Sequence, residues 1–456
     1  DLQVSYHAGL VSAREEKALG VNVNFDPCVD ILYNWRNTIV NTRAYGTDAE
    51  TVIKYTNAYL DGLTAENGEN MEDGVIQCIK HFPGDGTEER DQHLVLGVNE
   101  LSPEEWRASF GKVYQNHIDR GVEMIMAGHI AVPALQKELN SALEDKDIMP
   151  ATLAEELIQD ALKTELGFNG LVITDATHML GMTSAMRRED YVPKSIAAGC
   201  DMFLFFNNIE EDFGFMLKGY QNGVITEERL TDALRRILGL KAKLHLPEKQ
   251  ANGTLLRTRE DLNVIGCEEH LQWRAEAADK GISLIKDTQN NLPINPVDHK
   301  RIRLYMLEGE KGGITDNGSK AQQLFVDELT KRGYEVTVNE RGSRVKGATL
   351  KYRDEVDFAL EVADIAGYGA QNNYRIQWST AMANEVPWFV WEVPHAFVSL
   401  NFTTHLHDAT MVKTFVNAYH NNEETIKQVI DKLEGKSEFK GGHNDLVWTD
   451  KWQAKL

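Results

Sequence analysis

The chain has 456 residues, which at about 100 to 200 residues per domain favours two or three domains. Its apolar fraction of 42% and charged fraction of 26% are ordinary for a globular protein and exclude a largely disordered chain. The formal net charge of −22 repels phosphate backbones and anionic lipid headgroups, so nucleic acid is excluded as the expected partner. We expect no membrane span, because no stretch reaches the roughly 18 consecutive apolar residues of a membrane helix.

The four cysteines, Cys28, Cys78, Cys200 and Cys267, lie far apart and form no CxxC pair. Their spacing therefore indicates neither a zinc knuckle nor a disulfide framework. Residues 1–20 also lack the apolar core of a signal peptide. The acidic charge and the unpaired thiols favour a cytoplasmic location, with a secreted or cell-surface location as the alternative.

The first half of the chain reads as a series of βα units, because short apolar runs alternate with amphipathic stretches from residue 21 to about 240. Capping boxes at residues 102–105 and 152–155 predict the starts of two helices, and the second helix should end near Gly167. Parallel strands joined by helical crossovers follow from this alternation. The predicted strands are Val21–Phe25, Gly74–Ile79, Val122–Met126, Leu171–Thr174 and Met202–Phe206.

Polar side chains at the ends of these strands favour a (β/α)8 barrel of the TIM type over an open doubly wound sheet. Asp30, Lys80, His81, His129 and Asp175 each follow or end a predicted strand. A barrel gathers such residues on one rim. No GxGxxG or GxxxxGK[ST] turn supports a nucleotide-binding sheet. We assign the barrel to residues 1–244.

The second half predicts a smaller α/β sandwich after a polar, strand-poor linker. The linker is assigned to residues 245–262 and the sandwich to residues 263–456. Helices are expected near Ala321–Lys331 and Glu423–Leu433. The predicted strands are Ile282–Ile285, Ile302–Met306, Tyr334–Val338 and Trp388–Trp391.

The densest group of reactive side chains lies in the loop at residues 80–93. Pro83 and two glycines make this loop rich in turns, so we expect a mobile cover over a substrate. Asp91 and His93 are two residues apart, and the carboxylate can fix the tautomer of the imidazole and leave its other nitrogen as acid or base. The alternative is a solvated loop with an incidental histidine.

The other candidates each have a functional and a structural interpretation. Asp175, at the end of an apolar strand, is a nucleophile or base, or else the N-cap of the next helix. Lys80 and His81 clamp sugar hydroxyls, or Lys80 closes an ion pair inside the barrel. His129 is a ligand or a satisfied histidine of the rim, and Arg43 is a substrate clamp or a loop anchor.

The string KHFPGDGTEERDQH at 80–93 resembles the KHFPGHG(x)nDSH signature of the family 3 glycoside hydrolases, in their β-N-acetylglucosaminidase branch. The second half is similar to the flavodoxin-like domain of the two-domain members, for example in ISLIKD at 282–287 and EVPHAFVSLN at 392–401. Five further motifs match in the same order: LGVNVNFDPCVDI at 19–31, NTRAYGTDAE at 41–50, MIMAGHI at 124–130, GFNGLVITDATHM at 167–179 and AAGCDMFLF at 197–205.

This resemblance implies a role for each candidate residue. Asp175 matches the nucleophile, His93 the general acid/base and Asp91 its dyad partner. A retaining glycosidase needs a carboxylate that forms the glycosyl-enzyme and a second group that protonates the leaving oxygen and later activates water. The scheme requires no metal and no organic cofactor. The residues expected to bind the sugar are Arg43, Lys80, His81 and His129.

Three residues depart from the family pattern. Asp85 stands where the family commonly has His, Gln92 replaces the usual Ser of the dyad tripeptide, and Ala176 follows the nucleophile where an acidic residue is frequent. Family members also have roughly one hundred residues before the LGVNVNF motif, where this sequence has about twenty. Because a barrel without two strands would expose its edges, we expect sequence to be missing there.

The resulting functional prediction is a retaining exo-β-N-acetylglucosaminidase with a carbohydrate substrate, such as cell-wall fragments or chitooligosaccharides. Phosphorolysis remains an alternative, because a neutral histidine does not repel phosphate as a carboxylate would. β-Glucosidase activity is a further alternative within the family. A non-catalytic sugar-binding protein is the alternative from another class.

Overall fold

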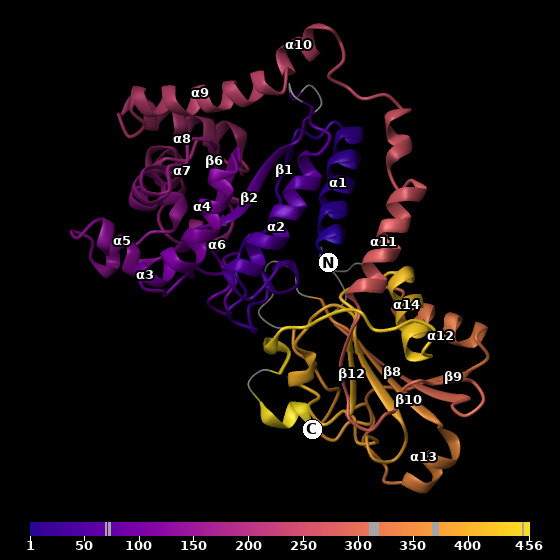
Figure 1. The fold of residues 1–456 in the computed structure, drawn as a ribbon. Helices are drawn as coiled ribbons and strands as arrows, with labels where there is room; N and C mark the ends of the chain where they lie inside the picture. The colour runs from indigo at the N-terminus through magenta and orange to yellow at the C-terminus, as the bar shows by residue number, and fades with distance from the viewer. Residues whose placement is uncertain (69–70, 72–73, 310–318, 367–373, 449–450) are drawn as a thin grey trace. The chain divides into compact units, whose positions relative to one another are not determined.

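The computed structural model describes residues 1–456 except 69–70, 72–73, 310–318, 367–373 and 449–450. The described chain divides into two compact units, Asp1–Leu271 and Gln272–Leu456 (Figure 1). Each unit contains mainly parallel sheet and helices, so the fold is α/β as predicted.

The first unit is organised around a four-stranded parallel sheet with the order β1-β2-β4-β6. Its strands fall within or overlap four of the predicted ones, and β6 has the predicted bounds. A small parallel pair, β3 and β5, lies apart from this sheet. The strands are β1 (Val23–Asn24), β2 (Ile76–Phe82), β3 (Gly97–Val98), β4 (Met124–Ala127), β5 (Ile130–Ala131) and β6 (Leu171–Thr174).

The fifth predicted strand, Met202–Phe206, is wrong as a regular strand. Met202 makes only an isolated bridge with Ile173. The next ladder bond is replaced by a side chain, because the hydroxyl of Thr174 accepts the backbone N–H of Leu204 at 3.0 Å. Eight barrel strands are thus not seen in the described part of this unit, which shows the parallel sheet and its crossovers.

Helices pack around this sheet, and α1 and α2 make the closest pair (Figure 1). A Cβ on Gly9 would lie 1.9 Å from the carbonyl oxygen of Tyr59, and one on Gly62 would lie 1.9 Å from that of Tyr6. Glycine is therefore required at both crossing positions. The helices of this unit are α1 (Leu2–Leu19), α2 (Ala49–Thr64), α3 (Pro103–Trp106), α4 (Lys112–Asp119), α5 (Pro133–Leu139), α6 (Leu180–Thr183), α7 (Arg188–Ala198), α8 (Ile209–Gln221), α9 (Glu227–Lys243) and α10 (Leu246–Ala251).

The first predicted capping box is confirmed and the second is wrong. Ser102 and Glu105 cap α3 reciprocally. In contrast, the helix after Thr152 is π-helical over Glu156–Glu165, and no side chain caps its start. The Thr152 hydroxyl is instead bonded to the ring of His129 at 3.0 Å. The helix ends just before Gly167, as predicted, where the backbone φ is +73°.

The second unit contains a six-stranded sheet with the order β7-β12-β11-β10-β8-β9. All neighbours are parallel except β12 and β7. From β9 to β12 the order is that of doubly wound α/β sheets. The strands are β7 (Ser283–Asp287), β8 (Arg301–Glu308), β9 (Glu335–Val338), β10 (Phe358–Asp364), β11 (His395–Ser399) and β12 (Thr414–Asn417).

The predicted strand Trp388–Trp391 is wrong, because this segment forms turns between Pro387 and Pro394. Its Phe389 is buried and stacks on Tyr305 of β8 with the ring centroids 4.8 Å apart, so the aromatic run packs on the sheet instead of joining it. The predicted helices α12 (Ala321–Lys331) and α14 (Glu423–Leu433) are confirmed; α11 (Glu268–Gly281) and α13 (Thr349–Glu355) were not predicted.

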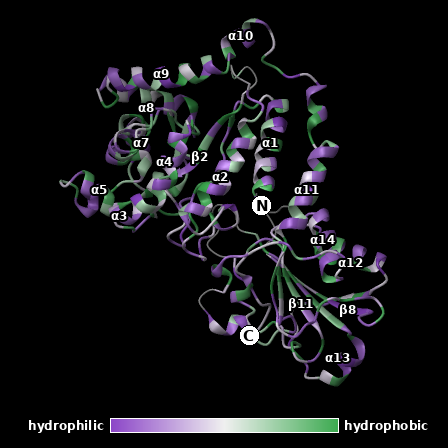
Figure 2. Ribbon diagram, in the orientation of Figure 1, coloured by the Kyte–Doolittle hydropathy of each residue, from purple (hydrophilic) through white to green (hydrophobic). Residues whose placement is uncertain are grey.

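Gly266 and His270, just after the predicted linker at residues 245–262, bond to the first helix. Glu15 of α1 accepts hydrogen bonds from the backbone N–H of Gly266 at 2.9 Å and from the His270 ring at 2.8 Å. Helices of the first unit, such as α1 and α9, carry both hydrophilic and hydrophobic residues along their length (Figure 2). Within the described residues, no helix combines the length and the apolar character that crossing a membrane requires.

Candidate active site

Asp175 follows β6 directly and is held by the backbone on two sides. Its N–H donates to the carbonyl of Ala127 at 2.8 Å, and its Oδ1 accepts the N–H of Ala176 at 2.7 Å. Its Oδ2 lies 3.9 Å from Nε2 of His81, and the side chain is 14% exposed. The carboxylate thus has one oxygen fixed by the main chain and the other directed toward the end of β2, two strands away in the sheet.

The charge of Asp175 is favoured by its surroundings. Burial raises the pKa of this carboxyl, but the neighbouring imidazoles of His81 and His129 and the N–H of Ala176 lower it by more, so the pKa lies below its ordinary value. Asp175 is therefore an anion at neutral pH. An ionised, nearly buried carboxylate at a strand end has the properties of a nucleophile.

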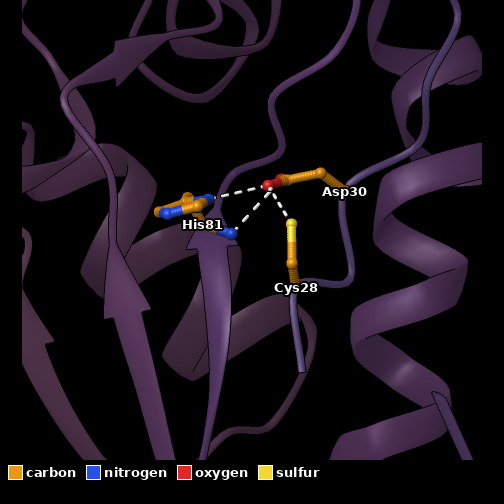
Figure 3. A group of neighbouring side chains, drawn as sticks. All are labelled: Cys28, Asp30 and His81. Carbon is orange, nitrogen blue, oxygen red and sulfur yellow. Dashed lines mark hydrogen bonds and ion pairs between the residues drawn. The ribbon is translucent and has the colours of Figure 1, made fainter. Parts of the chain in front are cut away.

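His81, at the end of β2, is oriented by the buried carboxylate of Asp30 (Figure 3). Its Nδ1 lies 2.7 Å from Oδ2 of Asp30, and its backbone N–H donates to Oδ1 at 3.2 Å. Burial raises the pKa of Asp30, but His81 and backbone N–H groups lower it to about 2. Because the ionised carboxylate can only accept, Nδ1 carries a proton and Nε2 faces Asp175.

Asp91 and His93 form the predicted hydrogen-bonded pair. Oδ1 of Asp91 accepts from the His93 backbone N–H at 2.8 Å and lies 2.6 Å from Nδ1 of the ring. Asp91 is buried, whereas the His93 side chain is 35% exposed. Partial burial lowers the pKa of His93, but the bond and the charge of Asp91 raise it above its ordinary value. The exposed Nε2 side is available for proton transfer.

The loop that carries this pair is tied to the chain after Asp175. The carbonyls of His93 and Gln92 accept the N–H groups of Leu180 and Gly181, at 3.0 and 3.1 Å. A Cβ on Gly181 would lie 2.8 Å from the carbonyl oxygen of Gln92, so glycine permits this approach. The contact brings the dyad and Asp175 to one site although 82 residues separate Asp175 from His93 in sequence.

The first half of the loop is buried, against the expectation of a mobile cover. Asp85 N–H donates to Oδ1 of Asp30 at 2.8 Å, and the Asp85 carboxylate accepts from Gly86 N–H at 2.6 Å and from Asn37 at 3.0 Å. A Cβ on Gly86 would lie 2.2 Å from the carbonyl oxygen of Ile31. Gly86 therefore permits close packing of the loop on the main chain.

Two of the residues that depart from the family pattern, Gln92 and Asp85, contact each other, and His129 links Gln92 to the third, Ala176. Gln92 Nε2 lies 3.5 Å from Oδ2 of Asp85, and its Oε1 accepts the N–H of His129 at 2.7 Å. The fully buried His129 ring bonds to Thr152 on one nitrogen and to the carbonyl of Ala176 at 2.9 Å on the other. Burial lowers the pKa of His129, which keeps the ring neutral. His129 therefore lies behind the site, with both ring nitrogens engaged.

Lys80 and Arg43 lie at the edge of the site. Lys80 Nζ is 3.8 Å from the carboxylate of Asp26, whose side chain is 53% exposed. The exposed Arg43 is anchored by its Nε–H on the carbonyl of Ile39 at 2.7 Å. Desolvation lowers the pKa of Arg43, but Cys28, Asp30, Asp85 and Asp175 raise it by more, so its cation faces the acidic centre.

The structure thus brings Asp175, His81 and the Asp91–His93 pair to one end of the parallel sheet, with Arg43 in its electrostatic range. Asp30 was recognised as a strand-end residue, but sequence reasoning did not assign it to the site; its position two residues after Cys28 on the first strand end was the available signal. The role of Gln92 as a link had no sequence signal, because it depends on a contact with His129.

An ionised strand-end carboxylate and a nearby Asp–His pair are groups that the cleavage of a glycosidic bond requires. Residues 1–240 match the family described as glycosyl hydrolase family 3 N terminal domain. The chain is also 40% identical over 454 residues, 98% of its length and 78% of the relative's, to a β-N-acetylglucosaminidase/β-glucosidase of Cellulomonas fimi. The chain belongs to glycosyl hydrolase family 3.

Further relatives differ in name and in coverage. A solved structure named β-glucoside phosphorylase BglX has a TM-score of 0.92 and 37% identity, covering 100% of this chain and 80% of that one. A β-hexosaminidase A of Pseudoalteromonas piscicida is 28% identical over 60% of this chain, which spans 45% of that relative. A family 3 β-N-acetylglucosaminidase structure from Paenibacillus, 21% identical with a TM-score of 0.74, shares the fold over 97% of this chain and 79% of that one.

Proposed function

We propose that the chain removes a terminal β-linked sugar from glucosides or N-acetylglucosaminides with retention of configuration. Asp175 attacks the anomeric carbon while His93 Nε2–H protonates the leaving oxygen. Water, activated by the then neutral His93, releases the sugar from Asp175 in the second step. The juxtaposition of ionised Asp175 with the partly exposed His93 of the 2.6 Å dyad is the observation that carries this proposal.

The remaining residues divide into sugar-binding and supporting roles. His81 lies beside Asp175, and it binds the sugar hydroxyls together with Arg43 and Lys80 at the edge of the site. Asp30 fixes the ring of His81, and His129 supports the loop from behind. N-acetylglucosamine-bearing fragments of cell wall or chitin are the proposed substrates, on the strength of the motifs and of the names of the relatives.

The test compares 4-nitrophenyl β-N-acetylglucosaminide and 4-nitrophenyl β-glucoside as substrates. Release of nitrophenol from either, with the β configuration in the first sugar product by NMR, is the expected result. Asp175→Ala should abolish release, and Asp160→Ala, an exposed carboxylate of the Glu156–Glu165 helix, is the matched control. Product of inverted configuration would refute the covalent mechanism.

A second candidate function is phosphorolysis, in which phosphate and not water attacks the glycosyl-enzyme. It is favoured by the similarity to a structure named β-glucoside phosphorylase and by the use of a histidine, which in its neutral form does not repel a phosphate anion. Turnover with and without phosphate distinguishes the two. Formation of a sugar 1-phosphate in preference to the free sugar would identify phosphorolysis.

A further inference from the structure

His81 is one of three buried side chains of different chemistry that lie close together. Its Nδ1, the ring nitrogen that faces away from Asp175, points into this group. Cys28, Asp30 and His81 are 2%, 0% and 5% exposed. The Cys28 thiol donates to Oδ2 of Asp30 at 3.1 Å, and His81 Nδ1 lies 2.7 Å from the same oxygen (Figure 3). The other oxygen, Oδ1, accepts two backbone N–H groups, from His81 and Asp85. The carboxylate is therefore held rigidly, with a thiol and an imidazole converging on one of its oxygens.

These three side chains provide the donor atoms of a zinc site. Sulfur, imidazole nitrogen and carboxylate oxygen all ligate Zn²⁺, and the three atoms lie within 4.8 Å of one another. Among the residues that the structure describes, this is the single group of three or more metal-ligating side chains so close together. The mixed donor set distinguishes it from an acidic surface cluster.

The geometry needs only a small expansion to accept the ion. Bond lengths of about 2.0 to 2.3 Å in a tetrahedron place neighbouring ligand atoms roughly 3.4 to 3.6 Å apart. The two separations at Oδ2 are 3.1 Å for the thiol and 2.7 Å for the ring, so the thiol must move outward by about 0.3 to 0.5 Å and the ring by about 0.7 to 0.9 Å. Side-chain rotation of Cys28 and His81 about the fixed Asp30 supplies such a movement.

We propose that Cys28, Asp30 and His81 form a site for a thiophilic divalent cation such as Zn²⁺, and that its occupation inhibits the enzyme. Binding forms Zn–S, Zn–N and Zn–O bonds. It breaks the S–H bond of Cys28, whose proton is released to water, and it displaces the Nδ1 proton of His81 to Nε2, or to water where Nε2 already carries a proton. No electron is transferred. Binding therefore weakens as the pH falls, because protons compete for the thiolate.

Occupation changes the part of His81 that faces the substrate. His81 Nε2 lies 3.9 Å from Oδ2 of Asp175, so turning the ring toward the ion moves this nitrogen away from the nucleophile. The inhibitory effect rests on the proposed function of Asp175, whereas binding of the ion does not.

The experiment follows metal binding and turnover in the same preparations. Co²⁺ is titrated into metal-free enzyme, and the thiolate-to-cobalt absorption is recorded together with one-to-one Zn²⁺ uptake by calorimetry. The variants are Cys28→Ser and Cys28→Ala, with Cys78→Ser as the matched buried control on β2. All carry Cys267→Ser, because Cys267 is half-buried while the other three cysteines are buried.

The expected result is a cobalt absorption in the Cys78→Ser protein and in the parent, lost in both Cys28 variants. The Zn²⁺ concentration for half-inhibition, relative to each variant's own metal-free rate, should rise at least about tenfold without Cys28. Absence of the absorption in the parent, or its survival without Cys28, overturns the site. Cys28-dependent binding without loss of activity overturns the inhibition. If the chain cleaves no glycoside, the cobalt spectra still decide the site, so the two proposals fail separately.

Discussion

Replacing Asp85 by Asn should stabilise the first unit above neutral pH. The Asp85 side chain is buried beside Asp30, and burial, together with the charge of Asp30, raises its pKa from 3.8 to about 7. The folded protein therefore holds a proton that the unfolded chain releases between about pH 4 and pH 7. Stability from this group is present below pH 4 and is lost as the pH rises through 7.

The full shift corresponds to about 4 kcal/mol in the free energy of unfolding at pH 8. Asn retains the oxygen that accepts from Gly86 and Asn37, but it places an amide group against the amide of Gln92. We therefore expect Asp85→Asn to recover about half, or about 2 kcal/mol, seen as a melting temperature about 5 °C higher.

Thermal and urea unfolding at pH 5 and pH 8 measure this effect. The gain should be large at pH 8 and small at pH 5. Asp30→Asn is the matched control and should destabilise the protein at both pH values, because Asp30 is the ionised member, whose pKa is lowered to about 2. A loss of stability in Asp85→Asn at pH 8, or an equal gain at both pH values, would refute the reasoning.

Three further predictions concern the reaction. Asp175→Ala should lower turnover by roughly 10⁴-fold, and azide should restore part of it and yield the glycosyl azide of inverted configuration by NMR; activity equal to that of the parent would exclude Asp175 as nucleophile. His93→Ala should lower turnover of a natural disaccharide by about 10²- to 10⁴-fold and the nitrophenol burst far less, because nitrophenolate needs little protonation; equal losses in steady-state and burst kinetics would indicate a binding role only. In Asp91→Asn the pKa of His93 should fall, because Asp91 raises it, so the fall of kcat/KM at high pH should begin at a lower pH; an unchanged pH profile would contradict the dyad.

Local pattern predicted the elements whose boundaries are set by their own residues. β6, α12 and α14 have the predicted bounds. Leu171–Thr174 is a wholly buried run, and Asn422 precedes α14 as its N-cap, with a side chain that accepts the N–H of Thr425. In these cases burial and capping act within a few residues of the chain, where a sequence pattern displays them.

Prediction failed where a partner distant in sequence decides the structure. Trp388 and Phe389 have strand-forming side chains, yet flanking prolines and stacking on Tyr305 make the segment a cover over the sheet. Glu361 lies in the middle of β10, where its charge interrupts the apolar run that would have indicated a strand. Burial raises its pKa well above the ordinary value, so the buried group is a neutral acid and the sheet tolerates it.

The candidate site was predicted where its contacts are local in sequence and missed where they are long-range. Asp91 and His93 are two residues apart, and their bond is local, so the sequence could show it. Thr152 had a capping pattern, but the neutral ring of His129 needs a donor at Nδ1 when its Nε2–H is given to the carbonyl of Ala176. The hydroxyl of Thr152 satisfies that buried nitrogen, and a buried polar atom without a partner costs more than an uncapped helix start that can bond to water. The hydrogen bond from Thr152 to the distant His129 therefore replaces the local helix cap. A capping pattern beside an active site does not predict where a helix begins when its side chain is needed by a residue distant in sequence.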